Sequence, residues 1–292
     1  MSGAIGFSDL HPAVILGYFV SVIAVTMCVY HPVFIAFSFF ASLLCLLLIE
    51  RDKALKTLGA EFILFILISL INQLFTANGS TIIFSFFDRP FTFEALVYGM
   101  CAAGVFCAAL QWLACFGALF TEEKFISLFS MFSPTLTLLF SMVLKLIPEL
   151  SGKLNRIKED RLHIGRIDAE SVTDKVGAST EILSVTIGWA MESAADTAAS
   201  MKARGYGCGK RTSFTGYRFR TKDFFLLAFI LLADALIVAA LIKGKTSAVF
   251  YPSIILAPVS KITLAVYAMQ LFLPTIIYVS ELLKWHISIS KI

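Results

Sequence analysis

The segment from Leu10 to Ile49 contains no Asp, Glu, Lys or Arg. A helix of about 20 mostly apolar residues crosses ~30 Å of hydrocarbon. The segment therefore has room for two spans, divided at His31-Pro32 because proline disfavours helix at the residue before it. The whole chain is 58% hydrophobic and 15% charged, whereas soluble globular chains are about 45–50% apolar and about 25% charged. This composition excludes a soluble single domain, a disordered chain and a small disulfide scaffold. It indicates a polytopic integral membrane protein.

We expect an all-α polytopic membrane protein with about six transmembrane helices and a long helical cytoplasmic domain. The expected spans lie near Pro12–Val29, Pro32–Ile49, Phe62–Thr76, Ala95–Phe120, Phe224–Ile242 and Ile262–Ser280. No Lys or Arg precedes Arg51, so the basic n-region of a signal peptide is absent. We therefore expect the first apolar segment to remain in the mature protein.

A seventh apolar run, Phe125–Leu144, is expected not to cross the membrane. Cytoplasmic loops are enriched in Lys and Arg, and the basic regions are Arg51–Lys56 and Lys145–Lys222, of which the second holds 14 of the chain's 24 basic residues. If both are cytoplasmic, an even number of spans separates them, and Phe62–Thr76 and Ala95–Phe120 already supply two. The seventh run would then lie along the cytoplasmic face, be buried among other helices or follow a re-entrant path.

The chain is expected to divide into three parts. Residues 1–124 would hold four spans, residues 125–222 the helices at the cytoplasmic face, and residues 223–292 two spans. Both chain termini and the basic insertion would lie in the cytoplasm. The localisation that follows is a multi-pass protein of the cell membrane, in contact with the lipid bilayer.

The polar interval Pro148–Lys222 predicts two helices. Glu149–Arg166 is rich in Lys, Arg, Glu and Leu and favours the first. Ser171–Ser179 predicts a break, and Ser179 or Thr180 could cap the second helix. That helix is expected to end at Gly205, because glycine readily adopts the left-handed conformation that follows a helix. A basic helical arm of this kind suits the docking of a partner.

Motifs of catalysis are missing from the sequence. It holds no phosphate-binding Gly-rich loop, no His-Glu-x-x-His and no Gly-x-Ser-x-Gly. It also holds no Cys-x-x-Cys, and its four histidines are scattered. We therefore expect no catalytic residue, no cofactor and no metal site. The net charge of +4 is too small to suggest a nucleic-acid partner.

Two charged residues are candidates for a function. Asp234 lies near the middle of an expected span, where a carboxylate must face protein or water. It is either an ion or proton site or a structural carboxylate bonded to a neighbouring helix. Arg204 lies between two small residues, Ala203 and Gly205. It is either a solvated side chain at the helix end or a guanidinium free to enter a partner's groove.

The stretch Met201-Lys202-Ala203-Arg204-Gly205-Tyr206-Gly207 resembles the second Ala-Arg-Gly signature of the T component of energy-coupling factor (ECF) transporters. Other stretches agree in order and spacing: His11-Pro12, Asn72-Gln73-Leu74-Phe75, and Ser133-Pro134 through Ile147-Pro148-Glu149-Leu150. The similarity covers nearly the whole chain.

The resemblance implies a non-catalytic scaffold of an ATP-driven importer. In that family two ATP-binding cassette ATPases bind the long coupling helices, and a membrane-embedded S component binds the vitamin or metal ion. Each signature arginine would enter a groove of one ATPase. By resemblance, the ATPase-coupling residues here are Ala203, Arg204 and Gly205, with Ile164, Gly165 and Arg166 at the first signature.

The first signature departs from the family pattern. Ile164 stands where the family has arginine, and Gly165 matches. Arg161 or Arg166 could supply the charge from a different turn of the helix. A stand-alone secondary transporter or channel that uses Asp234 is the alternative reading, although such a carrier has little use for a long cytoplasmic arm. An integral membrane enzyme is disfavoured because its catalytic residues are missing.

Overall fold

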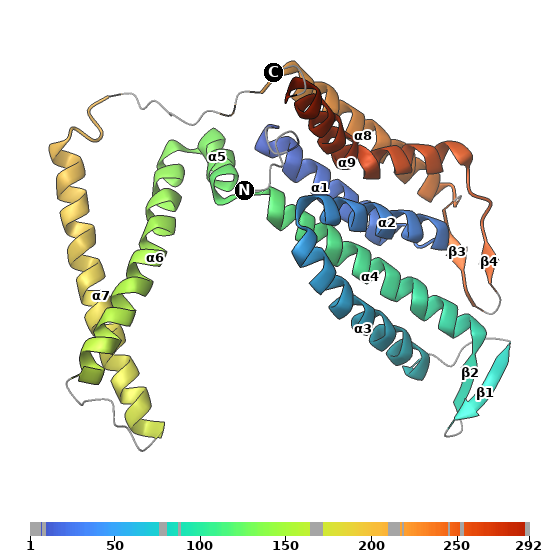
Figure 1. The fold of residues 1–292 in the computed structure, drawn as a ribbon, viewed down its shortest axis with the longest axis horizontal. Coiled ribbons are helices and arrows are strands. Elements are labelled where there is room, and N and C mark those ends of the chain that lie inside the picture. Colours follow the sequence, from blue (N-terminus) through green and yellow to red (C-terminus); the bar gives the residue numbers. More distant parts are fainter. Residues whose placement is uncertain are drawn as a thin grey trace. The chain divides into compact units, whose positions relative to one another are not determined.

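A computed structural model describes residues 7, 10–75, 81–86, 89–163, 172–209, 217, 219–244, 246–251 and 254–289. The chain forms two compact units, which are considered separately. The first unit comprises Met1–Phe125 and Tyr217–Ile292, and the second comprises Ile126–Gly216. The all-α polytopic fold class is confirmed, because the described residues are mainly helical and several helices are long and apolar enough to cross a membrane (Figure 1).

Among the described residues of the first unit, six long helices correspond to the six expected spans. They are α1 (Pro12–Cys28), α2 (Pro32–Ile49), α3 (Arg51–Phe75), α4 (Phe93–Leu119), α8 (Thr221–Ile242) and α9 (Lys261–Ile289). The His31-Pro32 division is confirmed: the side chain of His31 caps α2 by accepting from the backbone N–H of Val33 across 3.3 Å. Proline follows at the first helical position, where its missing N–H has no helical partner to lose.

By length and hydropathy, the helices that could cross a membrane differ slightly from the six expected spans. Helical segments suited to cross a bilayer are Pro32–Ile49, Ala54–Phe75, Phe93–Leu119, Thr135–Arg161, Thr221–Ile242 and Lys261–Ser280, while α1 is shorter at 17 residues. Seventeen residues is still at the lower end of the range that spans hydrocarbon. Thr135–Arg161 belongs to the second unit and has the lowest mean hydropathy of the set, 1.3. Its exclusion from the membrane therefore remains a prediction.

The core of the first unit is aromatic and tightly packed. Tyr18, Phe19 and Trp112 are fully buried, and the ring centroids of Tyr18 and Phe19 each lie 6.2 Å from that of Trp112, edge to face. A Cβ added at Gly104 of α4 would lie 2.9 Å from the side chain of Ile35 in α2. The two helices approach this closely because glycine has no side chain, a common device between membrane helices.

The helices alternate in direction, so several of their ends meet at one end of the unit. Phe7, Ile49 and Leu119 line the same small cavity. The ring of His11, at the start of α1, lies 5.0 Å from that of Phe219, just before α8. The beginnings of α1 and α8 and the last turns of α2 and α4 therefore share one end of the first unit.

The opposite end carries two short antiparallel hairpins that the sequence did not predict. β1 (Ile82–Phe86) pairs with β2 (Arg89–Thr92) between α3 and α4, and β3 (Ala248–Val249) pairs with β4 (Ile255–Leu256) between α8 and α9 (Figure 1).

Aromatic rings from different elements contact one another at this end of the first unit. The ring of Tyr30, between α1 and α2, lies 5.4 Å from that of Tyr98 in α4 and 5.8 Å from that of Phe250 beside β3. Tyrosine is enriched where membrane helices meet the aqueous interface. The cluster therefore fits the rim of a membrane protein.

The apolar run Phe125–Leu144 is not one helix. It is divided between α5 (Glu122–Phe132) and α6 (Pro134–His163) at Ser133. Pro134 opens α6, and the hydroxyl of Thr137 donates to the Ser133 carbonyl across 3.1 Å. The buried ammonium of Lys124 in α5 donates to the carbonyl of Leu119, the last residue of α4, across 2.5 Å.

Both predicted helices of the second unit are longer than expected. The first was predicted as Glu149–Arg166, but α6 begins at Pro134 and continues through Pro148. The predicted break at Ser171–Ser179 is wrong, because α7 runs from Val172 to Ala203. A glycine such as Gly177 costs only about 1 kcal/mol in a helix interior. The packing of α7 on α6 offsets a penalty of this size.

Candidate coupling site

In the described part of the second unit, α6 and α7 pack on each other through apolar side chains. Leu150 and Leu154 of α6 and Leu183 and Ile187 of α7 line a shared groove of about 310 Å³, together with Ala190 and its neighbours. The ammonium of Lys153 lies 5.3 Å from the ring centre of Trp189, a cation–π contact across the same pair. α6 and α7 therefore form one structural element rather than two independent arms.

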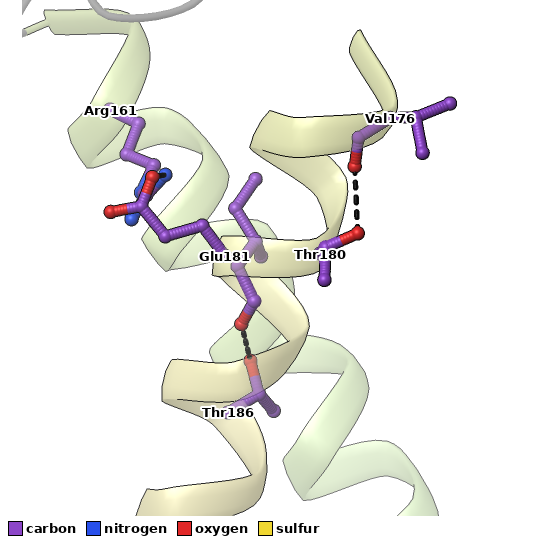
Figure 2. A network of polar contacts seen from close by, with 6 residues as sticks. Arg161, Val176, Thr180, Glu181 and Thr186 are labelled. Carbon is purple, nitrogen blue, oxygen red and sulfur yellow. Dashed lines mark hydrogen bonds and ion pairs between the residues drawn. The ribbon is translucent and has the colours of Figure 1, made fainter. Parts of the chain in front are cut away.

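An ion pair fastens the helices near the end of α6. The guanidinium of Arg161 donates to the Glu181 carboxylate across 2.7 Å (Figure 2). The hydroxyls of Thr180 and Thr186 donate to the carbonyls one turn earlier, so they stay within α7. Thr180 thus has a mid-helix role, not the capping role that the sequence predicted. Arg161 is committed to Glu181 in this structure.

The predicted signature lies at the last turn of α7. The N–H of Tyr206 donates to the Met201 carbonyl and that of Gly205 to the Lys202 carbonyl, both across 3.0 Å. With φ +81° at Gly205, these two bonds make a Schellman cap, in which left-handed glycine closes the helix. The predicted end of the helix at Gly205 is confirmed.

The cap sets the environment of Arg204. Ala203, Arg204 and Gly205 are all exposed, and a Cβ at Gly205 would meet no atom within 4 Å. The backbone N–H of Arg204 donates to the Ser200 carbonyl across 3.1 Å, which fixes the root of the side chain. The arrangement presents a guanidinium with five N–H donors on a rigid helix end, with small neighbours on both sides.

No protein-family model matches the chain, and no curated protein matches it. The residues expected to carry the first signature, Ile164, Gly165 and Arg166, lie outside the described residues.

Asp234 occupies a different place, inside the first unit. Its carboxylate in α8 accepts from the hydroxyl of Ser21 in α1 and from the side-chain amide of Gln270 in α9, each across 2.8 Å. The same amide also lies 2.8 Å from the Ser21 hydroxyl. Asp234 thus joins three helices, as a structural carboxylate would. No group of three metal-ligating side chains occurs among the described residues.

A second intramembrane carboxylate, Glu61, was missed by the sequence analysis. The expected third span began at Phe62, but α3 starts at Arg51 and its membrane segment at Ala54, so Glu61 lies inside it. The side-chain amide of Gln111 in α4 donates to the Glu61 carboxylate across 2.6 Å. The signal available in the sequence was Gln111, a lone amide within an otherwise apolar span.

Proposed function

We propose that this chain is the energy-coupling membrane scaffold, or T component, of an ECF-type importer for a vitamin or a metal ion. In this proposal two ATP-binding cassette ATPases hydrolyse ATP, and a small membrane-embedded S component binds the substrate. The chain itself catalyses nothing and transmits motion from the ATPases to the S component. The observation that carries the proposal is Arg204, exposed on the capped end of a 32-residue helix.

The geometry of that helix end suits a coupling role. A guanidinium forms strong, directional bonds with carboxylates and carbonyls, and the Schellman cap at Gly205 keeps Arg204 in a fixed place. A force applied there would pass along α7 and reach α6 through the ion pair of Arg161 with Glu181 and the apolar contacts between the helices. A helical lever of this kind is what an ATPase needs to move a membrane partner.

The arrangement of helix ends supports placing this unit on one side of the membrane. The last turn of α4 and the start of α8 share one end of the first unit, so the chain between them must cross an even number of times. Thr135–Arg161 is the one segment of the second unit that has the length and hydropathy of a span, among the described residues. A single crossing by this segment is inconsistent with the shared position of the end of α4 and the start of α8. We therefore favour an arrangement in which the second unit does not cross the membrane.

By the positive-inside rule, the basic unit lies in the cytoplasm. Both termini then lie in the cytoplasm, the two hairpins face outward, and the chain resides in the cell membrane. The stand-alone carrier that uses Asp234 is the alternative. The hydrogen bonds of this carboxylate to Ser21 and Gln270 favour a structural role over an ion or proton pathway.

The test is affinity purification of the tagged chain from its native membrane in mild detergent, with co-purified proteins identified by mass spectrometry. We expect two ATP-binding cassette ATPases and one small hydrophobic protein. Arg204→Glu should lower the recovered ATPase roughly tenfold, the effect of losing a charge-assisted contact. Lys202→Glu is the matched control on the same turn and should have a much smaller effect. A chain recovered alone, or equal losses in both variants, would overturn the proposal.

A further inference from the structure

A large cavity lies among α2, α3 and α4 of the first unit. Its volume is about 750 Å³, within the range of about 300–1,000 Å³ that is typical of small-molecule sites. Its walls are apolar and include Ile35, Phe39, Phe65 and Met100. Such a space suits a hydrocarbon chain.

One charged side chain, Glu61, stands among the described residues that line this cavity. Only 9% of Glu61 is exposed, and Oε2 of its carboxylate accepts from Nε2 of Gln111 across 2.6 Å. For Oε1, no hydrogen-bond donor is found within the part of the chain that the structure describes. The cavity therefore has a carboxylate oxygen with room for one more donor.

The carboxylate is held in place by a second contact behind it. Oε1 of Gln111 accepts from the hydroxyl of Ser42 in α2 across 2.6 Å, and Gln111 is completely buried. Because both ends of the amide are engaged, Gln111 cannot turn away from Glu61. Gln111 of α4 and Ser42 of α2 thus hold the Glu61 carboxylate of α3 in place at the wall of the cavity. By contrast, Asp234, held by a similar pair of side chains, does not line this cavity.

The place where the cavity opens and the depth of Glu61 in the membrane segment both favour a lipid as the occupant. Phe40 and Phe62 line the cavity and remain about two-thirds exposed, at 65% and 66%, so its mouth lies on the bilayer-facing surface. Glu61 follows Ala54, the first residue of the membrane segment of α3, by seven positions, about 10.5 Å along the helix. At this depth it lies within reach of a lipid headgroup.

We propose that the cavity binds a phospholipid with an ammonium headgroup, such as phosphatidylethanolamine. One acyl chain occupies the apolar space, and the ammonium donates a hydrogen bond to Oε1 of Glu61. A carboxylate attracts an ammonium and repels an anionic headgroup, so the site discriminates by headgroup charge. This inference does not depend on the proposed coupling function.

Native mass spectrometry of the purified full chain tests the proposal, with an equal mixture of dioleoyl phosphatidylethanolamine and dioleoyl phosphatidylglycerol as the probe. We expect the wild-type chain to retain phosphatidylethanolamine roughly tenfold over phosphatidylglycerol. Glu61→Gln keeps an oxygen that can accept from Gln111 but removes the charge, so the preference should fall close to parity. Asp234→Asn, which removes an intramembrane carboxylate outside the cavity, should leave the preference unchanged.

A second pair of variants tests the cavity itself. Ala36, which lines it, is exposed, so Ala36→Trp should fill the space and lower the retention of both lipids severalfold. Ala235→Trp, at an exposed position of α8, is the matched control and should retain them. The proposal is overturned if the wild-type chain shows no preference or prefers phosphatidylglycerol, if Glu61→Gln keeps the preference, or if the two tryptophan variants retain lipid equally.

Discussion

The carboxylate of Glu61 and the side-chain amide of Gln111 form a 2.6 Å hydrogen bond between α3 and α4. Ser42 of α2 completes the chain of contacts by donating to the same amide. Buried polar groups are tolerated in an apolar bundle when each has a partner, and they then fix which helix faces meet. Here one amide satisfies groups on two neighbouring helices.

Replacing Gln111 with leucine should destabilise the first unit. Gln111→Leu would leave the Glu61 carboxylate without its donor, which costs about 1–3 kcal/mol for an unsatisfied buried group. The Ser42 hydroxyl keeps the Phe39 carbonyl as acceptor. The midpoint of thermal unfolding of the purified protein in detergent should fall accordingly. Leu113→Ala, at an exposed position of the same helix, should change stability by about 0.5 kcal/mol or less. Equal midpoints for Gln111→Leu and the wild type would contradict the prediction.

The sequence predicts the helices of the first unit because its signals there are strong. Uncharged runs of about 20 residues have few alternatives to a membrane helix, and the His31-Pro32 pair ends one such run and begins the next. Glu61 was missed for the opposite reason. A charged residue usually marks the edge of a span, so the sequence predicts that the third span begins at Phe62, whereas Gln111, far away in the sequence, supplies the partner that allows Glu61 inside.

In the second unit, the sequence predicts where α7 ends but does not predict where α6 and α7 begin. Gly205 marks the end of α7 through a local rule, since a left-handed residue is favoured there. The sequence predicts a break that includes Gly177 and a helix cap at Ser179 or Thr180. However, α7 continues through these positions because Glu181 and its neighbours pack on α6. The groove shared by α6 and α7 involves side chains far apart in the sequence, which periodicity alone could not bring together.

The glycine that caps α7 and a glycine inside this helix should respond to alanine in opposite directions. Gly205 has φ +81°, so Gly205→Ala places a side chain in the left-handed region at a cost of roughly 1–2 kcal/mol. Gly177 lies inside the helix with free space around its Cβ position, so Gly177→Ala should stabilise the helix by up to about 1 kcal/mol. Hydrogen exchange at the Tyr206 amide, which closes the cap, should be faster in the first variant alone. Unchanged exchange in Gly205→Ala would show that the cap does not depend on glycine.

The stability of the first unit should fall as the pH drops below about 6.5, the ordinary pKa of histidine. Burial lowers the pKa of His31, and Nδ1 of the neutral ring accepts from the Val33 N–H. Because the folded state disfavours the protonated ring, the contribution of His31 is complete above the unfolded pKa and is lost as the pH falls through it towards the folded value.

Unfolding midpoints at pH 7.5 and pH 5.5 measure this effect. His31→Asn keeps a side chain suited to cap a helix but cannot titrate in this range, so the difference between the two midpoints should shrink in this variant. If the wild type and His31→Asn lose the same stability between the two conditions, groups other than His31 control the pH dependence.

The membrane orientation can be read from a native thiol. Cys208 follows α7 and is exposed, whereas Cys45, Cys101, Cys107 and Cys115 are buried. In a Cys28→Ser background, a membrane-impermeant maleimide should therefore react with Cys208 alone before denaturation. We expect labelling in inside-out vesicles and none in intact cells, because the proposed arrangement puts the basic unit in the cytoplasm.

The matched control places a thiol at the other end of the first unit. Ser247 is exposed just before β3, so Ser247→Cys in a Cys28→Ser and Cys208→Ser background should give the reverse pattern, with labelling in intact cells. Labelling of both thiols in intact cells would mean that an odd number of crossings separates Leu119 from Cys208, because Leu119 and Thr221 share one end of the first unit. Thr135–Arg161 would then have to cross the bilayer, and the cytoplasmic placement of α7 and Arg204 would be wrong.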